Sequence, residues 1–170
     1  MRIFPVITIL IAVVAFSGCA SFQDVTRSPV PTINHFKPKL PGSAEIRRRI
    51  MIGKWFGEAF TKDGGQRKWL TERHSDGTYM ITFRKYGKNG SYEETREIGL
   101  WGITGDIYFS IMKGWVKNNQ IVPSDPENPY YYDAYKIIRL DMDYFEYKGV
   151  DDDERYILRK VKKDFQFPDY

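Results

Sequence analysis

The sequence has one cysteine and two histidines in 170 residues, and both shortages exclude kinds of site. A lone cysteine cannot form an internal disulfide, and His35 and His74 do not by themselves supply an ordinary zinc site. The chain also has no G-x-S-x-G elbow, no phosphate-binding glycine loop and no H-E-x-x-H motif. We therefore expect a protein that is not an enzyme and that holds no metal and no cofactor.

A strong excess of one charge is also missing, because 26 basic side chains face 22 acidic ones. This balance does not favour nucleic acid as a partner. The one basic cluster is Arg47-Arg48-Arg49. It is either a solvated helix face or, close to a membrane, a contact for anionic lipid headgroups.

The one long apolar run of the chain lies at its start. Arg2 precedes an apolar stretch from Ile3 to Phe16, followed by two small residues and then Cys19. The run is shorter than the roughly 20 residues that a membrane-spanning helix needs, and it contains Pro5. These features predict a secretory signal peptide over residues 1–18.

The order Phe16-Ser17-Gly18-Cys19 resembles the bacterial lipobox. The resemblance implies lipidation of Cys19, with a diacylglyceryl group on its sulfur, cleavage before it and a fatty acyl chain such as palmitate on its new amino group. Several acyl chains together anchor a protein stably to a membrane. Ala20 follows, not aspartate, which in such lipoproteins implies the outer membrane and leaves the leaflet open. The alternative is a buried cysteine in an ordinary signal peptide.

The rest of the chain divides into a linker and one domain. Residues 19–42 contain Pro29, Pro31, Pro38 and Pro41 without apolar periodicity, which predicts a flexible linker on the anchor. Residues 43–170 are long enough for one domain with its own core. Ser43 is the expected N-cap of a short helix that ends at Gly53.

Beyond Gly53 the pattern indicates strands, with aromatic and β-branched residues in short runs between Gly, Asn and Asp turns. About eight sequential antiparallel strands favour an all-β, up-and-down barrel, because closure removes exposed sheet edges. We predict strands at 54–61, 66–74, 77–86, 91–102, 105–113, 130–140, 143–148 and 153–161.

Gly53-Lys54-Trp55 resembles the G-x-W signature of lipocalins and lipocalin-like barrels. In that family the tryptophan closes the barrel floor, and a basic residue near the last strand packs across its ring. The resemblance implies this role for Arg159, with Arg155 and Lys160 as alternatives.

The fold analogy implies that the barrel binds a small hydrophobic or amphipathic ligand. Expected interior positions are Trp55, Trp69, Tyr79, Ile81, Phe83, Phe109, Ile111 and Tyr156. Since 16% of the chain is aromatic, the alternative is a filled barrel that acts as a tethered adaptor or inhibitor of another envelope protein. A third hypothesis is a hydrolase or isomerase that uses Glu94, Arg96 or Arg73 at the barrel mouth.

Three further segments have two interpretations each. The segment 114–129 contains three prolines and is either a lid or a surface loop, and Tyr130-Tyr131-Tyr132 after it is either a contact surface or ordinary strand. Asp151-Asp152-Asp153-Glu154 is a calcium loop or, more simply, a solvated turn. Tyr92, Glu94 and Arg96 would form a polar pocket if they point inward.

Overall fold

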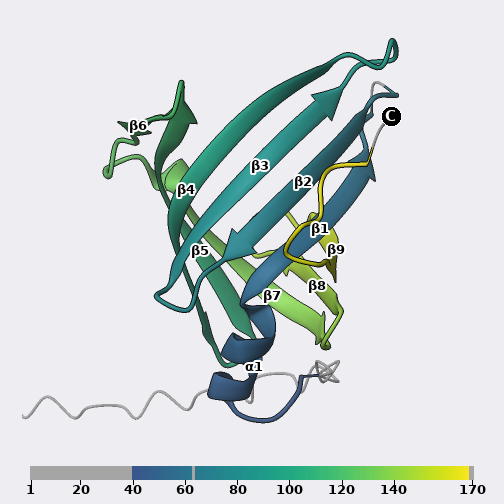
Figure 1. Ribbon diagram of the computed structural model, residues 1–170. Coiled ribbons are helices and arrows are strands. Elements are labelled where there is room, and N and C mark those ends of the chain that lie inside the picture. The colour runs from purple at the N-terminus through teal and green to yellow at the C-terminus, as the bar shows by residue number, and fades with distance from the viewer. Residues whose placement is uncertain (1–39, 63, 169–170) are drawn as a thin grey trace, which may run out of the picture. The chain divides into compact units, whose positions relative to one another are not determined.

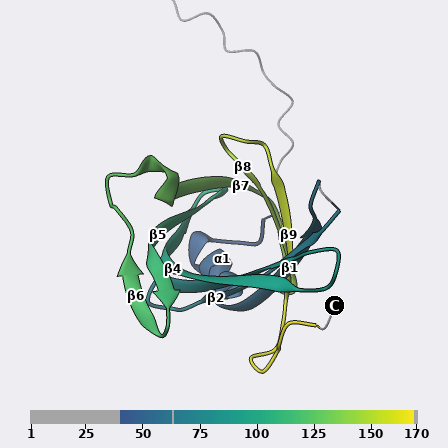
Figure 2. The same cartoon turned by 90° about the horizontal axis from the view of Figure 1, so that it is seen from above.

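The computed structural model describes residues 40–62 and 64–168, all of which belong to one unit of residues 36–170. Its main feature is a closed ring of eight antiparallel strands, with a helix below one end and a ninth strand outside the ring. Figure 2 shows the ring seen along its axis, with the helix at the far end. The predicted all-β barrel with a short N-terminal helix is therefore confirmed.

The strands follow one another around the ring in chain order, apart from β6. β1 pairs with β2 on one side and with β9 on the other, and the β4–β5 pairing completes the circuit. The elements are α1 (Ala44–Met51), β1 (Gly53–Phe60), β2 (Gln66–Arg73), β3 (Thr78–Tyr86), β4 (Tyr92–Thr104), β5 (Ile107–Lys117), β6 (Gln120–Pro123), the 3₁₀ helix η1 (Pro129–Tyr131), β7 (Tyr132–Leu140), β8 (Tyr144–Gly149) and β9 (Arg155–Lys160).

The segment 114–129 is the one place where the predicted elements were wrong. β5 runs on to Lys117 and turns back through Asn118 and Asn119, both with positive φ, into β6. Two consecutive positive φ values are typical of a type I′ hairpin turn, for which asparagine is well suited. The Asn-Asn pair was therefore a hairpin signal. Of the prolines that follow it, Pro123 ends β6, Pro126 lies in the connection and Pro129 begins η1.

The folded part also begins slightly earlier than expected. Leu40, which was assigned to the linker, packs against the core. Ser43 is the N-cap, and its Oγ accepts a hydrogen bond from the backbone N–H of Ile46 at 3.4 Å. The helix therefore starts at the position that the sequence predicted, and Leu40 before it already packs against the barrel core.

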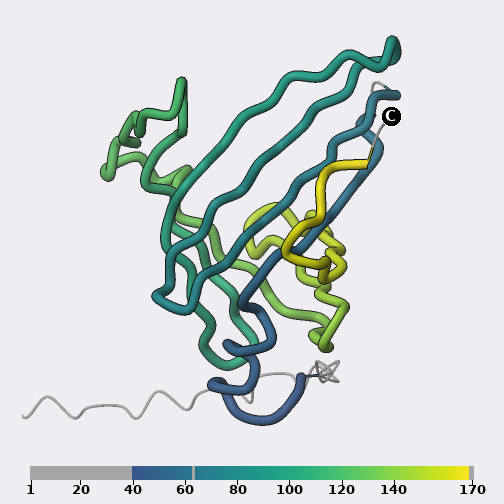
Figure 3. The backbone as a smooth tube through the Cα atoms, viewed as in Figure 1, coloured from purple at the N-terminus to yellow at the C-terminus, as the bar shows by residue number. Residues whose placement is uncertain are grey.

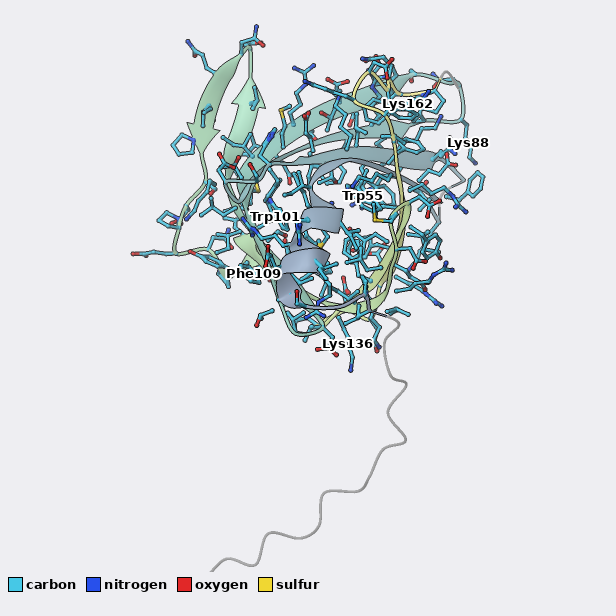
Figure 4. All side chains as sticks on the ribbon, turned by 60° about the horizontal axis from the view of Figure 1, so that its bottom comes forward. Trp55, Lys88, Trp101, Phe109, Lys136 and Lys162 are labelled. Atoms are coloured by element: carbon cyan, nitrogen blue, oxygen red, sulfur yellow. The ribbon has the colours of Figure 1, made fainter. Side chains whose placement is uncertain are left out.

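Helix α1 closes one end of the barrel through its last turn. Trp55 is fully buried, and its indole Nε1 donates to the carbonyl oxygen of Met51 at 2.9 Å. Lys160 Nζ donates to the carbonyl oxygen of Ile50 at 2.7 Å. Both carbonyls lie at the C-terminal end of the helix, where main-chain oxygens have no partner within the helix. Figure 4 shows Trp55 and Trp101 within the ring, beside this helix.

Lys160, not Arg159, packs across the Trp55 ring. Its Nζ lies 5.2 Å from the ring centroid, whereas the Arg159 guanidinium lies over Tyr144 at 5.6 Å. The reason is the alternation of β9, in which Leu158 and Lys160 face inward and Arg159 faces outward. The assignment of this role to Arg159 was wrong, and the alternative Lys160 is correct.

The C-terminal segment after β9 covers the outer face of β1 and β2 (Figure 3). Phe165 and Phe167 contact Phe56, with ring centroids 5.2 and 6.2 Å away. Lys68 Nζ donates to the carbonyl oxygen of Pro168 at 3.3 Å, and this outward lysine is consequently buried. The C-terminal segment thus covers this apolar part of the outer surface.

The Lys160 contact predicts unequal effects for two neighbouring substitutions. Lys160→Met removes the donor to the Ile50 carbonyl and the cation over Trp55, so we expect a loss of about 1 to 2 kcal/mol in the free energy of unfolding. Arg159→Met on the outer face is the matched control and should change it by less than about 0.5 kcal/mol. Urea unfolding followed by tryptophan fluorescence measures both, and equal losses would contradict the assignment.

Candidate ligand-binding chamber of the barrel

Six of the eight predicted interior residues do lie inside the barrel. Trp55, Trp69 and Tyr79 belong to the buried core, while Ile81, Phe83 and Tyr156 are partly buried against it. The alternation of β3 was predicted correctly, because Tyr79, Ile81 and Phe83 share the inner face and Met80 is exposed.

The prediction that Phe109 and Ile111 face the interior was wrong, because the inner face of β5 carries Tyr108 and Ser110 instead. Phe109 is 37% exposed and lies over Gly102 on the outside, where an added Cβ would come within 2.2 Å of its ring. Tyr108 is nearly fully buried. Both faces of this strand have apolar or aromatic residues, so alternation alone did not decide which one faces inward.

The half of the barrel next to α1 is filled by rings. Tyr108 packs edge-on against Phe145 and Tyr147, with centroids 5.7 and 5.5 Å away, and Phe145 packs edge-on against Trp55 at 6.0 Å. Tyr147 stacks on Tyr156 at 5.1 Å. Burial raises the pKa of Tyr147 well above its usual range, so its hydroxyl stays protonated at physiological pH.

The other half is hollow. A chamber of about 440 Å³ lies toward the end opposite α1, and a smaller cavity of about 70 Å³ lies deeper in the barrel. Arg67, Phe83 and Tyr135 line both, which makes the cavity an inward extension of the chamber. The other chamber residues are Lys85, Glu93, Thr95, Glu97 and Asp133; the other cavity residues are Trp69, Thr71, Arg73, Ile81, Tyr108, Ser110, Tyr147 and Tyr156.

Arg73 is the most unusual side chain of this interior, with only 1% of its surface exposed. Its guanidinium lies over the rings of Tyr108 and Phe145, at 4.8 and 5.4 Å from their centroids, and Nη2 donates to the Tyr108 hydroxyl at 3.1 Å. Nε and Nη1 are buried without a hydrogen-bond partner. A buried guanidinium with open donors is costly unless something else pairs with it.

The chamber entrance has charges of both signs. Glu97 is half-buried, and burial, followed by the negative charge of Asp133, raises its pKa above the ordinary 4.5, while Arg67 acts in the opposite direction. The Ser110 hydroxyl reaches an Asp133 oxygen at 3.5 Å. Thus the entrance is polar and partly acidic, and the deep end is basic.

The residues of the enzyme hypothesis do not meet at one site. Glu94 and Arg96 lie on the outer face of β4, where Glu94 bonds Arg84 at 2.9 Å and Arg96 at 2.8 Å. They line an outer groove with Phe165 and Phe167, whereas Arg73 is inside. Tyr92 faces outward with them and lies beside Arg84. The condition for a polar pocket of Tyr92, Glu94 and Arg96, that these side chains point inward, is therefore not met.

The basic triplet of residues 47–49 and the acidic turn of residues 151–154 both form contacts within the chain. Arg48 lies 4.7 Å over the Trp101 ring and Arg47 bonds the Gly42 carbonyl, so the basic triplet does not form one free patch. In the turn between β8 and β9, Asp153 pairs with Lys148 at 2.6 Å. Among residues 40–62 and 64–168, no three His, Cys, Asp or Glu side chains are grouped so as to hold a metal ion.

Strands β5 and β6 project from the barrel wall as a two-stranded tab, defined as residues 114–123 (Figure 1). Ile121 is 63% exposed on it, and Tyr130 in the following connection is 87% exposed. Trp115 packs edge-on against Tyr131 at 5.6 Å. Exposed apolar and aromatic side chains thus lie on and beside this hairpin, and their role as a contact surface stays a prediction.

The lipidation residue Cys19, the signal peptide and nearly all of the predicted linker lie outside the described residues. Within the described residues, no helix has the length and hydropathy required to span a bilayer.

No protein-family model matches the sequence, and no curated protein matches it. Among solved structures, the chain is similar to a lipocalin-like protein from Bacteroides uniformis ATCC 8492, with 16% identity, coverage of 66% of this chain and 99% of that chain, and a TM-score of 0.43. A likeness of this size concerns the fold at most. The strand pairing of this chain itself shows a closed antiparallel barrel of eight strands.

Sequence reasoning missed the basic interior, although a signal was available. Arg67, Trp69, Thr71 and Arg73 alternate along β2, so all four share one face. Because Trp69 was already expected inside, the two arginines should have been placed there with it.

The raised pKa of Glu97 predicts a pH-dependent substitution effect. A carboxyl whose pKa is higher in the folded state contributes full stability below its unfolded pKa and loses it as pH rises through the folded pKa. Glu97→Gln should therefore raise the urea midpoint at about pH 7, and this gain should shrink toward about pH 4.

Glu94→Gln is the control, and its effect on the urea midpoint should have the opposite sign. Partial burial acts to raise the pKa of Glu94, but hydrogen bonds from Arg84 and Arg96 lower it overall. The substitution should destabilise the protein at neutral pH, and the loss should diminish in acid. The same sign for both variants would contradict the electrostatic account of the entrance.

Proposed function

We propose that this protein is a binding protein, not an enzyme, and that its barrel takes up a small amphipathic molecule. The observation that carries the proposal is the chamber of about 440 Å³ with its deeper extension. Pockets for small ligands have volumes of about 300 to 1,000 Å³ and combine apolar walls with a few polar groups. The chamber has this size, and its lining combines the rings of Phe83 and Tyr135 with a larger share of polar and charged side chains than is usual.

The division of the interior supports a ligand in the outer half only. Packed aromatic rings fill the half near α1, and this packing includes Tyr108, Phe145 and Tyr147. The ring of strands therefore needs no ligand for its core. A molecule in the chamber would contact the rings of Phe83 and Tyr135 and the polar and charged side chains that line it with them.

Native mass spectrometry of the full chain, purified gently from its own host, tests this function. We expect an additional mass of a few hundred daltons that denaturation removes. Thr95→Trp places an indole in the chamber, because Thr95 lines it, and should abolish the additional mass. Leu100→Trp is the control, since Leu100 is exposed on the outside of the same strand. Loss in both variants, or retention in both, would contradict binding in the chamber.

A second candidate function is that of an adaptor or inhibitor that binds another envelope protein. The tab with its exposed Ile121 and the adjacent Tyr130 supports it, because large aromatic and aliphatic side chains are enriched in interface cores. A clean apo mass from gently purified protein would favour this function over ligand binding.

We also propose that the barrel is tethered to the bacterial outer membrane by lipids on Cys19. The support is the lipobox-like order Phe16-Ser17-Gly18-Cys19 after an apolar run.

Cys19→Ser should stop lipidation and leave the signal peptide uncut, because the acylated sulfur is then missing. The mature, lipidated form should disappear, and the protein that remains should be an unlipidated precursor whose mass includes the first 18 residues. Ser17→Ala is a mild control that keeps a small residue before the cysteine. Normal maturation of the Cys19→Ser variant would contradict the lipid anchor.

A further inference from the structure

We infer that the deep cavity is an anion site, in which Arg73 receives the carboxylate of an aromatic or other planar acid whose body lies in the chamber. The inference rests on the proposed ligand-binding function and names the class of ligand. It depends on three features of the interior: the open donors of Arg73, the small size of the cavity, and the rings that line the cavity.

The first feature is a cation without a counter-ion. No salt bridge among the described residues includes Arg73. Its Nε and Nη1 atoms lack partners, and these atoms carry three of the five donor hydrogens of a guanidinium. Ring faces stabilise the positive charge but do not satisfy its N–H groups. The planar guanidinium matches a carboxylate, which can accept two of its hydrogen bonds at once.

The second feature is the size of the space beside Arg73. At about 70 Å³ the cavity is about twice the volume of one water molecule in the liquid, which is about 30 Å³. A carboxylate fits such a space. Tyr108, Ser110 and Thr71, each of which carries a hydroxyl, line it. Tyr108 accepts its hydrogen bond from Arg73, so its own proton is available to an anion.

The third feature orients the ligand. Rings line the cavity itself, with Tyr135 edge-on to Tyr156 at 5.8 Å and Trp69 edge-on to Tyr156 at 6.2 Å. The chamber outside it carries the acidic Glu93, Glu97 and Asp133 beside the basic Arg67 and Lys85, so it offers a carboxylate no excess of positive charge. An acid therefore gains by placing its charged end against Arg73, with its planar body extending past these rings toward Phe83 and Tyr135.

The test compares an acid with its neutral analogue in the full chain, held in lipid nanodiscs so that no detergent competes. The probes are 2-naphthoic acid and 2-naphthalenemethanol, which share one ring system. We expect the acid to bind at least about 10-fold more tightly at neutral pH, from the usual strength of hydrogen bonds to charged groups. Arg73→Met should remove this preference and leave binding of the alcohol within about 3-fold.

Arg67→Met is the matched control, because Arg67 lines the same walls nearer the entrance. It should leave the preference for the acid in place. A preference that survives Arg73→Met, or that disappears only in Arg67→Met, would overturn the assignment to Arg73. Equal binding of acid and alcohol by the wild type would overturn the anion site and leave the ligand-binding function standing. Binding of neither probe would contradict both.

A wild-type measurement makes the inference independent of whether the variant folds. In crystals grown with 6-bromo-2-naphthoic acid, the anomalous signal should place the bromine in the chamber and the carboxylate against Arg73. A carboxylate at Lys85 on the entrance would contradict the proposal. Melting curves of Arg73→Met separate a folding defect from lost affinity. A folded variant that still prefers the acid would also contradict the proposal.

Discussion

The whole architecture depends on the seam between β1 and β9, the first and last strands of the ring. Trp55, Phe56 and Gly57 pair with Lys160, Arg159 and Leu158, and Val161 adds a backbone bond to Lys54 at 3.0 Å. Without this short seam the sheet would have two open edges and a wet apolar face. The seam also brings Lys160 over Trp55 and toward the end of α1, so the same strand pairing closes the ring and positions a residue of its floor.

The same closure divides the interior into a filled half and a hollow half. Rings around Trp55 and Phe145 occupy the space near α1, and their packing supplies the core that a barrel of this size needs. Toward the other end β3 and β4 extend beyond the shorter strands (Figure 1), and the chamber lined by Phe83, Thr95 and Tyr135 lies on this side. Arg73 lies over the rings of Tyr108 and Phe145 and lines the deeper cavity.

Residue patterns predicted most of the fold because the physics that governs them is local. Turns such as Ser75-Asp76-Gly77 need residues that tolerate positive φ, and Gly77 indeed has φ 90°. The alternation of β3 showed its inner face because one side is clearly more apolar. On β5 the two sides are similar in hydrophobicity, and the choice between Phe109 and Tyr108 depended on Gly102, which accommodates the Phe109 ring outside. The role of Lys160 depended on the register of the seam.

The sequence by itself determined the strands, the helix start and the closed all-β architecture, because turn chemistry and period-two alternation act over a few residues. It also carries the whole argument for lipidation at Cys19. Only the tertiary structure decided what the barrel contains. Strand register decides whether aromatic residues fill it, whether Arg73 has a counter-ion and which basic residue covers Trp55. Register is set by contacts between residues far apart in the chain.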